Sequence, residues 1–277
     1  MGTRTWFVTG ASAGLGRTLT EKLLDQGERV VATARNPDSL ADLLERFPDR
    51  LATPRLDVTE QASIDAAVQS AIGRFGQIDV LVNNAGYGVV GTVEEVSDAE
   101  ARHQFDVNVF GLLNVSRPII AHMRANRSGL IYNISSIAGL ASSATFAIYC
   151  ASKHAVEGIS EGLAASVKPF GIKVVIVEPG AFRTRFHNGQ SIRTTENHIP
   201  DYAELRSGTA EWLEGIDGNQ PGDPEKLSAA LIAMADDPEP PLRLLCGQDA
   251  YDRAMAKLDS LRADFEKNAE LSRSMVY

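Results

Sequence analysis

Cysteine is scarce in this chain of 277 residues, which contains only Cys150 and Cys246. Two distant cysteines give no framework of disulfides and no spacing typical of a metal site, so we expect two small buried side chains and no bound metal. Basic residues are also in the minority, with 27 Lys and Arg against 36 Asp and Glu and a formal net charge of -9. No local Lys/Arg cluster offsets this balance, which argues against non-specific binding of nucleic acid.

Long hydrophobic runs are absent too. From Met1 the chain passes almost directly into the apolar run 6–8, without the basic segment, apolar stretch and cleavage site of a signal peptide. No apolar run approaches the length of a membrane span. We therefore expect a cytoplasmic protein with no membrane partner.

What the sequence does contain is a regular alternation of short apolar strands and helical patterns. Six strands are expected at 5–8, 29–33, 51–56, 78–82, 130–134 and 172–177, with a seventh at 242–245. Helices are expected at 15–25, 62–75, from Ser97 to about 125, 149–167, 224–234 and 249–271. Gly76 is expected to end the second of these, a capping box of Ser97 and Glu100 to begin the third, and Asp223 to cap the fifth. This order predicts an α/β fold, a Rossmann-type doubly wound parallel sheet of about seven strands with helices on both faces. We expect residues 1–277 to form one such domain.

Two later segments depart from the alternation. Between 181 and 222 aromatic residues are mixed with glycines, prolines and charges, without regular periodicity. A long irregular segment after the sixth strand predicts a substrate-binding lid rather than a linker. Residues 249–277 are expected to form a C-terminal helical extension.

A glycine-rich turn follows the first strand, in the order Thr9-Gly10-x-x-x-Gly14-Leu15-Gly16. Strand, glycine turn and helix N-terminus together form an anion site, because backbone N–H groups point outward and the missing side chains let a pyrophosphate approach. The spacing differs from the usual G-x-G-x-x-G, and a plain tight turn between strand and helix is the alternative.

Arg35 ends the second strand, and no acidic residue precedes Asp38. At this position an acid would bond a ribose 2′-hydroxyl, whereas an arginine accepts a 2′-phosphate. NADP(H) is therefore favoured over NAD(H). The alternative is a solvated arginine after a strand.

Tyr149 and Lys153 are spaced four residues apart in an expected helix, so they share one face. An ammonium beside a phenol makes the phenolic proton easier to lose. Taken alone, the spacing equally fits an aromatic ring against a lysine stem. Upstream, the pair Ser135-Ser136 and the polar turn 83–86 each follow an apolar strand, at the edge where open α/β sheets bind ligands.

Together these residues resemble the classical short-chain dehydrogenase/reductase family. The motifs occur in family order over roughly the first two-thirds of the chain: Thr9-Gly10-x-x-x-Gly14-x-Gly16, Asp57, Asn83-Asn84-Ala85-Gly86, Asn108, Ser136, Tyr149-x-x-x-Lys153 and Pro179-Gly180. The Ala34-Arg35 ending resembles the NADP-preferring branch with hydroxysteroid dehydrogenase-like and ketoreductase members.

The resemblance implies a catalytic set of Asn108, Ser136, Tyr149 and Lys153. Lys153 would also bind the nicotinamide ribose, and Asn108 would hold a water of a proton relay. Ser136 is preferred to Ser135 because its interval to Tyr149 resembles the family interval; Ser135 would then satisfy backbone at the strand end. The implied cofactor-binding residues are Gly10, Ser12, Gly14, Leu15, Gly16, Arg35, Asp57, Val58, Asn84, Ala85, Gly86, Tyr149, Lys153, Pro179, Gly180 and Thr184.

The chemistry expected of this set is NADPH-dependent reduction of a ketone, reversible as alcohol oxidation. Ser136 can donate to the carbonyl oxygen and Tyr149 can deliver the proton, provided that Lys153 and a cationic nicotinamide lower the tyrosine pKa. An apolar, bulky aromatic or polycyclic substrate is expected from the rim residues. These are Phe146, Phe182 and Phe186, with Ser136 and Tyr149 on the reacting oxygen, and Tyr87, Val89, Tyr202 or Trp212 nearby.

Two other functions were weighed. A catalytically silent NADP-binding sensor would be expected to lack a member of the catalytic set, and none is missing. A methyltransferase-like protein would give the turn 83–86 and the Tyr149-Lys153 pair no role. By resemblance, a homodimer or homotetramer should form through the helices that carry Asn108 and Tyr149, and the partner molecule is a small carbonyl or alcohol substrate.

Overall fold

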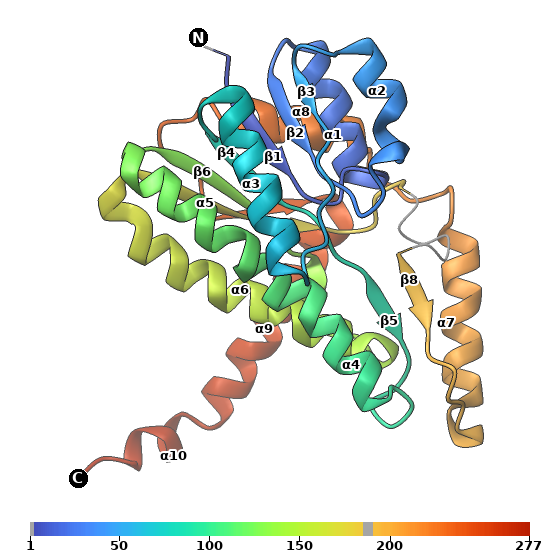
Figure 1. Cartoon of the computed structure of the whole chain (residues 1–277). Helices are drawn as coiled ribbons and strands as arrows, with labels where there is room; N and C mark the ends of the chain where they lie inside the picture. Colours follow the sequence, from blue (N-terminus) through green and yellow to red (C-terminus); the bar gives the residue numbers. More distant parts are fainter. Residues whose placement is uncertain (1–2, 185–190) are drawn as a thin grey trace.

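A parallel sheet forms the centre of the computed structural model, which describes residues 3–184 and 191–277 (Figure 1). Among these residues seven strands pair in the order β3-β2-β1-β4-β6-β7-β9. Their bounds are β1 Thr5–Val8, β2 Arg29–Ala32, β3 Leu51–Ala52, β4 Val80–Asn83, β6 Gly129–Ile134, β7 Ile172–Pro179 and β9 Arg243–Cys246. The order reverses between β1 and β4, and such a reversal opens a crevice at the carboxyl ends of the two strands.

The α-helices cover both faces of this sheet, as expected for a doubly wound fold. Helices α1 and α8 pack on one face, and α3, α5 and α6 pack on the other. The bounds are α1 Gly14–Asp25, α2 Ala41–Arg46, α3 Gln61–Phe75, α4 Asp98–Phe105, α5 Leu112–Asn126, α6 Ala147–Val167, α7 Ala203–Ile216, α8 Pro224–Met234, α9 Gln248–Lys267 and α10 Ala269–Ser274.

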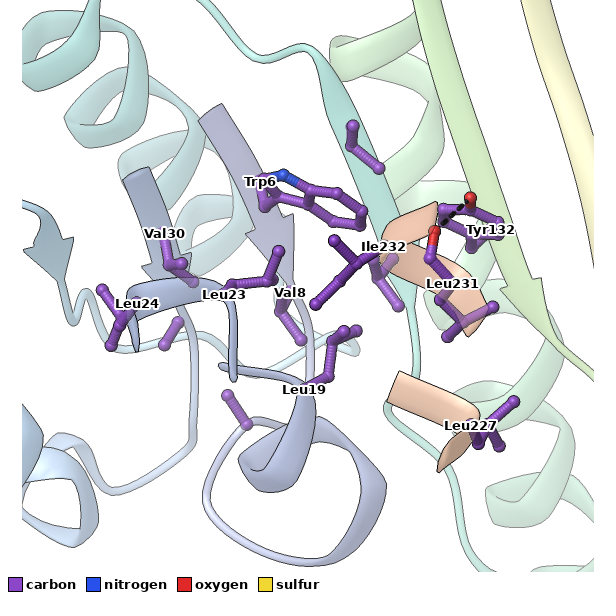
Figure 2. Close-up of a cluster of buried hydrophobic side chains, with 14 of the residues drawn as sticks. Trp6, Val8, Leu19, Leu23, Leu24, Val30, Tyr132, Leu227, Leu231 and Ile232 are labelled. Atoms are coloured by element: carbon purple, nitrogen blue, oxygen red, sulfur yellow. Dashed lines mark hydrogen bonds between the residues drawn. The ribbon is translucent and has the colours of Figure 1, made fainter. Parts of the chain in front are cut away.

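The alternation of side chains along β1 divides the core between the two faces. Trp6 and Val8 lie in the cluster under α1 and α8, whereas Phe7 lies in the cluster under α3 and α5. Trp6 stacks on Tyr132 of β6 with ring centroids 6.1 Å apart. The Tyr132 hydroxyl donates to the carbonyl oxygen of Leu231 in α8 at 2.8 Å, which ties α8 to the middle of the sheet (Figure 2).

Local signals at the element ends match the sequence predictions. Ser97 forms a capping box with Glu100 at the start of α4, and Gly76 ends α3 in the left-handed region with φ 82°. The side chain of Asp223 accepts from the backbone of Glu225 and Lys226 at the start of α8. Both cysteines are buried free thiols.

Three expectations about elements were wrong. β3 spans two residues rather than six, because Pro54 has no N–H to continue the ladder. The long helix from Ser97 is divided by a π-helical turn, Asp106–Gly111, which carries Asn108. Within the segment expected to be irregular lie the strand β8, Ile192–Thr194, paired with β5, Gly88–Val90, and the regular helix α7. Helix α7 has no buried residue among those described, so it packs at the surface of the molecule.

The C-terminal extension is helical, as predicted. Helix α9 starts against β9 and the short 3-10 turn Ile137–Gly139, where Ala250 and Ala254 are buried. Its later turns and α10 extend away from the body of the molecule (Figure 1). Only the first turns of α9 therefore contribute to the region around the sheet edge described below.

Candidate active site

The crevice at the β1/β4 reversal is lined by the glycine-rich turn and the start of α1. Gly10 and Gly14 have φ of 66° and 55°, which glycine adopts without strain. Ala13 precedes α1 and has no side chain that could cap the helix, so the first N–H groups face the crevice. A cradle of this kind suits a pyrophosphate, and a Cβ on Gly14 would stand 3.5 Å from the side chain of Thr184.

Gly16, expected to bind the cofactor, has a packing role in the structure. It does not line the cavity outlined by the described residues. A Cβ at this position would lie 2.5 Å from the carbonyl oxygen of Gly10 and 2.5 Å from Nδ2 of Asn84. Gly16 therefore lets α1 pack closely on the turn, and its effect on a cofactor is indirect.

Asn84 lines the cavity and also holds neighbouring backbone in place. Its Nδ2 donates to the carbonyl oxygens of Thr9 and Gly10 at 2.9 and 3.1 Å. The hydroxyl of Thr9 accepts from the backbone N–H groups of Asn84 and Ala85, each at 2.9 Å. The turn after β4 thus holds the turn after β1, and Ala85 and Gly86 line the cavity beside it.

Arg35 and Asp57 lie together at the far end of the crevice, with Val58 next to them. Arg35 is exposed and makes no hydrogen bond or ion pair with any residue that the structure describes. Burial raises the pKa of Asp57, but hydrogen bonds from Thr59 and the charge of Arg35 outweigh it, so the pKa is below its usual range. The far end of the crevice is therefore flanked by the ionised carboxylate of Asp57 and the guanidinium of Arg35.

Asn108 projects from the π-helical turn toward the loop after β4. Its Oδ1 accepts from the backbone N–H of Tyr87 at 3.0 Å, and its Nδ2 donates to the carbonyl oxygen of Tyr87 at 2.9 Å. Nδ2 also donates to Oγ of Ser152 in α6 at 3.0 Å. The Asn108 side chain is buried and does not line the cavity outlined by the described residues, so it joins the two helices and the loop behind the site.

Ser136 follows β6 in extended conformation, with φ of -174°. Its hydroxyl accepts from the backbone N–H of Ala138 at 3.1 Å and donates to the carbonyl oxygen of Pro179 at 3.4 Å. Ser136 lines the cavity. Ser135 is buried, and its Oγ finds no hydrogen-bond partner among the described residues, so the expectation that it satisfies backbone was wrong.

Tyr149 is buried near the start of α6 and faces the cavity. Burial raises the pKa of its phenol to about 12, although a hydrogen bond with Ser136 acts in the opposite direction. The chain alone therefore does not lower this pKa, and the expected joint effect of Lys153 and a cationic nicotinamide stays a prediction. At neutral pH the phenol carries its proton and stands beside the Ser136 hydroxyl.

Lys153 lies one turn further along α6 and is 7% exposed. Its Nζ donates to the carbonyl oxygen of Ile134 at 2.8 Å and lies 5.8 Å from the centre of the Tyr149 ring. Burial lowers the pKa of Lys153 to about 8, while the charge of Glu157 raises it. The predicted pair therefore does share one face, and its ammonium is held between β6 and the cavity.

One cavity of about 950 Å³ joins these parts. From the glycine-rich turn it passes Ser136, Tyr149 and Lys153 and continues between the 3-10 turn Ala144–Phe146 and α7. At this second end, the rings of Tyr149, Phe146 and Trp212 form an aromatic ladder. The ring centroid of Phe146 lies 6.4 Å from that of Tyr149 and 6.3 Å from that of Trp212. The predicted residues Ser12, Leu15, Pro179, Gly180, Phe182 and Thr184 also line the cavity.

Some rim predictions were wrong and some residues were missed. Val89 is buried in β5, and the hydroxyl of Tyr202 bonds Glu94, so neither lines the cavity outlined by the described residues. Phe186 falls outside the described residues. The cavity wall also includes His103, Arg193, Leu205, Asp249 and Arg253, which no local motif marks because they come from α4, β8, α7 and α9.

Asp249 is the missed residue with the clearest structural task. Its Oδ2 accepts from the backbone N–H of Ala181 at 2.7 Å, so the first turn of α9 holds the segment after Gly180.

No helix in 3–184 or 191–277 is long and apolar enough to cross a membrane. In the same ranges no group of three or more His, Cys, Asp and Glu is placed to hold a metal ion.

Comparison with known proteins identifies the arrangement. The family model "short chain dehydrogenase" matches residues 4–195. The oxidoreductase BOA17 of Botryotinia fuckeliana is 36% identical, with 98% of each chain covered. A 3-ketodihydrosphingosine reductase of Bacteroides thetaiotaomicron is 36% identical, with 87% of this chain and 86% of the relative covered.

Solved structures agree. A short-chain dehydrogenase of Streptomyces avermitilis superposes with a TM-score of 0.92 at 42% identity over 100% of both chains. Structures of the same fold at 28% and 25% identity contain NADP+ and NADH, which supports a nicotinamide cofactor. The chain is an oxidoreductase of the short-chain dehydrogenase family, acting on CH–OH or C=O groups.

Proposed function

We propose that this protein is an NADPH-dependent carbonyl reductase, reversible as an alcohol dehydrogenase, of the ketoreductase and hydroxysteroid dehydrogenase-like branch. The observation that carries the proposal is the position of Tyr149 and Ser136. Both lie where the glycine-lined end of the cavity meets its aromatic end. A carbonyl oxygen bound between them would meet two hydroxyl groups at the junction of a cofactor site and a substrate site.

Each residue of the candidate site has a separate role in the proposed ketone reduction. When bound, the nicotinamide supplies a hydride to the carbonyl carbon. Ser136 donates a hydrogen bond to the oxygen on which charge develops. Tyr149 gives that oxygen a proton, and its raised pKa keeps the proton available at neutral pH. Lys153 holds the ribose of the cofactor with its buried ammonium, and Asn108 keeps the loop at Tyr87 in place behind it.

Arg35 supports the choice of NADPH. Its guanidinium is exposed at the far end of the cavity, and no partner among the described residues competes for it. Asp57 beside it is engaged by Thr59 at 2.7 and 3.0 Å. A 2′-phosphate would find one free cation here, which favours NADP(H) over NAD(H).

The substrate end supports a bulky, mainly apolar ketone. Its wall is formed by the ladder of Tyr149, Phe146 and Trp212 together with Leu205 and Ile216. Aromatic walls bury large flat or extended apolar groups well. The relative named as a 3-ketodihydrosphingosine reductase is consistent with a large ketone substrate.

The test is consumption of NADPH, followed by its absorbance, with a panel of aromatic, polycyclic and long-chain ketones. We expect turnover with at least one bulky ketone and a fall of about 10²- to 10⁴-fold in kcat for Tyr149→Phe, the usual contribution of a general acid. NADPH titration by fluorescence is the control and should give similar binding for both proteins. Full activity of Tyr149→Phe would contradict the proposal, and binding without turnover on any ketone would favour the silent sensor.

Assembly and location are further proposals. Phe110, on the π-helical turn next to Asn108, is 51% exposed, a favourable position for a contact between two copies. We propose a homodimer or homotetramer paired through the helices that carry Asn108 and Tyr149, which light scattering would test. A cytoplasmic location is proposed from the sequence alone.

A further inference from the structure

Two carboxyl groups are buried behind Lys153, outside the substrate cavity outlined by the described residues. Glu157 lies one turn after Lys153 in α6 and is 6% exposed, and Glu178 lies near the end of β7 and is 0% exposed. Carboxylates removed from water are strongly destabilised unless cations and hydrogen-bond donors compensate them. The surroundings of this pair therefore decide its charge.

One guanidinium serves both groups. Nε of Arg243 lies 3.4 Å from Glu157 Oε2 and 3.3 Å from Glu178 Oε1, while its Nη2 bonds Glu161 at 2.9 Å. A single cation thus faces three carboxyl groups. With all three ionised, two negative charges would be left over, and the two buried groups would carry most of this cost.

The hydrogen bonding of Glu157 and Glu178 also disfavours ionisation of both carboxyl groups. Among the described residues, no carboxyl oxygen of Glu157 or Glu178 accepts a hydrogen bond of good geometry, and the ion pairs with Arg243 Nε are their nearest compensation. Burial, followed by the charge of Glu157 and a hydrogen bond between the two carboxyl groups, raises the pKa of Glu178 to about 8. Both carboxyl groups lie within 3.4 Å of the same Arg243 Nε, so two ionised carboxylates would repel each other there, and one shared proton would relieve this repulsion.

Glu157 and the strand end that delivers the catalytic serine both pack against Gly139. Oγ of Ser135 and Oε1 of Glu157 lie 2.7 and 3.1 Å from the point where a Cβ on Gly139 would stand. Ser135 Oγ has no other partner among the described residues, and its hydroxyl is available to Glu157. The buried pair is thereby placed between Lys153 and the Ser135-Ser136 turn.

We propose that Glu157 and Glu178 hold one proton between their carboxyl oxygens and that this proton sets the negative charge facing Lys153. With the proton in place the pair carries one negative charge, which Arg243 balances. When the proton leaves to water past the half-buried Arg243, the pair carries two, and Lys153 holds its ammonium more strongly. The two glutamates are positioning residues, and their effect on catalysis rests on the proposed function.

The other charged and titratable groups facing the pair come from two elements. Helix α6 contributes Lys153 and Glu161, and β9 contributes Arg243 and Cys246. Burial and the charge of Glu178 raise the pKa of the Cys246 thiol to about 12, so it stays neutral. The pKa of Lys153 is also lowered to about 8, so the lysine and the glutamate pair titrate over the same range, and variants of each glutamate are needed to separate them.

The first test needs no turnover. The infrared band of a protonated carboxyl group should be present in the wild type at about pH 6 and disappear above about pH 8. It should be absent in Glu178→Gln and unchanged in Glu161→Gln, which removes the exposed partner of Arg243. Absence of the band in the wild type at about pH 6 would overturn the proposal.

Thermal unfolding gives a second measure. An acid whose folded pKa is raised stabilises the fold below its unfolded pKa, and this stability is lost as pH rises through the folded pKa. Between about pH 5 and pH 8, Tm should fall in the wild type by roughly 5 °C more than in Glu178→Gln. Equal pH dependence in the two proteins would contradict a shared proton.

The effect on Lys153 is tested by NADPH binding against pH, followed by fluorescence. In Glu157→Gln the facing charge is lost, so the alkaline midpoint of binding should move to lower pH. In Glu178→Gln the charge stays on Glu157, so the midpoint should not fall. Parallel shifts in both variants would overturn the coupling. Because neither binding nor infrared requires a ketone, failure of the proposed reductase activity would remain distinguishable.

Discussion

Lys153 lies over the ring of Tyr149, with Nζ 5.8 Å from the ring centre, and donates to the carbonyl oxygen of Ile134 at 2.8 Å. The lysine is thereby tied to the end of β6, the strand that also delivers Ser136. One hydrogen bond therefore fixes α6 relative to β6 at the point where the reacting oxygen would bind. Burying the charged ammonium of Lys153 lowers the stability of the folded protein.

This cost predicts a pH-dependent difference between the wild type and Lys153→Met. Burial lowers the folded pKa of Lys153 to about 8, against 10.5 for an unperturbed lysine. The unfolded chain therefore binds more protons between these values, and the wild type should gain stability relative to the variant as pH rises from about 8 to about 10. Tm measured across this range checks it. Lys168→Met, at an exposed lysine, should show no such trend.

Arg35→Ala should weaken NADPH binding by about 10- to 100-fold, the usual value of a lost hydrogen bond between charged groups. NADH binding should change little, because it lacks the 2′-phosphate that Arg35 would meet. Fluorescence titration of both cofactors measures this. The control is Arg55→Ala, whose guanidinium is paired with Glu60 at 2.8 Å. Equal losses for NADPH and NADH would remove Arg35 from cofactor choice.

Gly16→Ala should destabilise the protein by about 1–3 kcal/mol, because the new methyl group overlaps backbone that cannot move freely. Its Cβ would stand 2.5 Å from the carbonyl oxygen of Gly10. Gly162→Ala is the matched control, since a Cβ there meets nothing within 4 Å on the exposed face of α6. That variant should gain about 0.5–1 kcal/mol from the better helix propensity of alanine. Chemical denaturation measures both, and an unchanged Gly16→Ala would contradict the close packing described.

Glu95→Gln should loosen α7 and raise KM more than it lowers kcat. Arg206 of α7 pairs with the buried Glu95, whose Oε1 also accepts from the backbone N–H of Ile199 at 3.0 Å. α7 carries Leu205 and Trp212 into the cavity wall. Glu211→Gln, at an exposed position of the same helix, should leave KM unchanged. A fall in kcat at constant KM would argue against a role in holding the lid.

The same pair has a signature in acid. Burial acts to raise the pKa of Glu95, but hydrogen bonds from Ile199 and Thr92 and the charge of Arg206 hold it at about 2. A lowered folded pKa gives stability above the unfolded value that is lost as pH falls. The wild type should thus lose its advantage over Glu95→Gln between about pH 4.5 and pH 2, as thermal unfolding would show.

Where the sequence sufficed, the signal was local. The apolar strands 5–8 and 78–82, the glycine turn and the caps at Ser97 and Asp223 act through neighbouring residues, and the structure has them as predicted. The family motifs likewise located Tyr149, Lys153 and Ser136 on one cavity. Helical spacing alone predicted that the first two would share a face.

What the sequence did not reveal depends on tertiary contacts. The π-helical turn around Asn108 lies where α4 and α5 meet α6, and α7 buries no described residue that would mark a core-facing side. Asp249 reaches Ala181 across 68 residues of sequence. The pKa of Tyr149 depends on burial in the folded chain, which the sequence does not give, and the combined effect of Lys153 and a cationic nicotinamide on this pKa stays a prediction.

The central claim is hydride transfer to a ketone at the junction of the two cavity ends. Its most direct measurement uses NADPH carrying deuterium at the nicotinamide C4 position, prepared separately for each face, with a ketone that the wild type consumes. Mass spectrometry of the product should show one deuterium on the carbinol carbon with one of the two labelled cofactors, and Tyr149→Phe should form this product far more slowly. Product alcohol without deuterium from either cofactor would contradict the account.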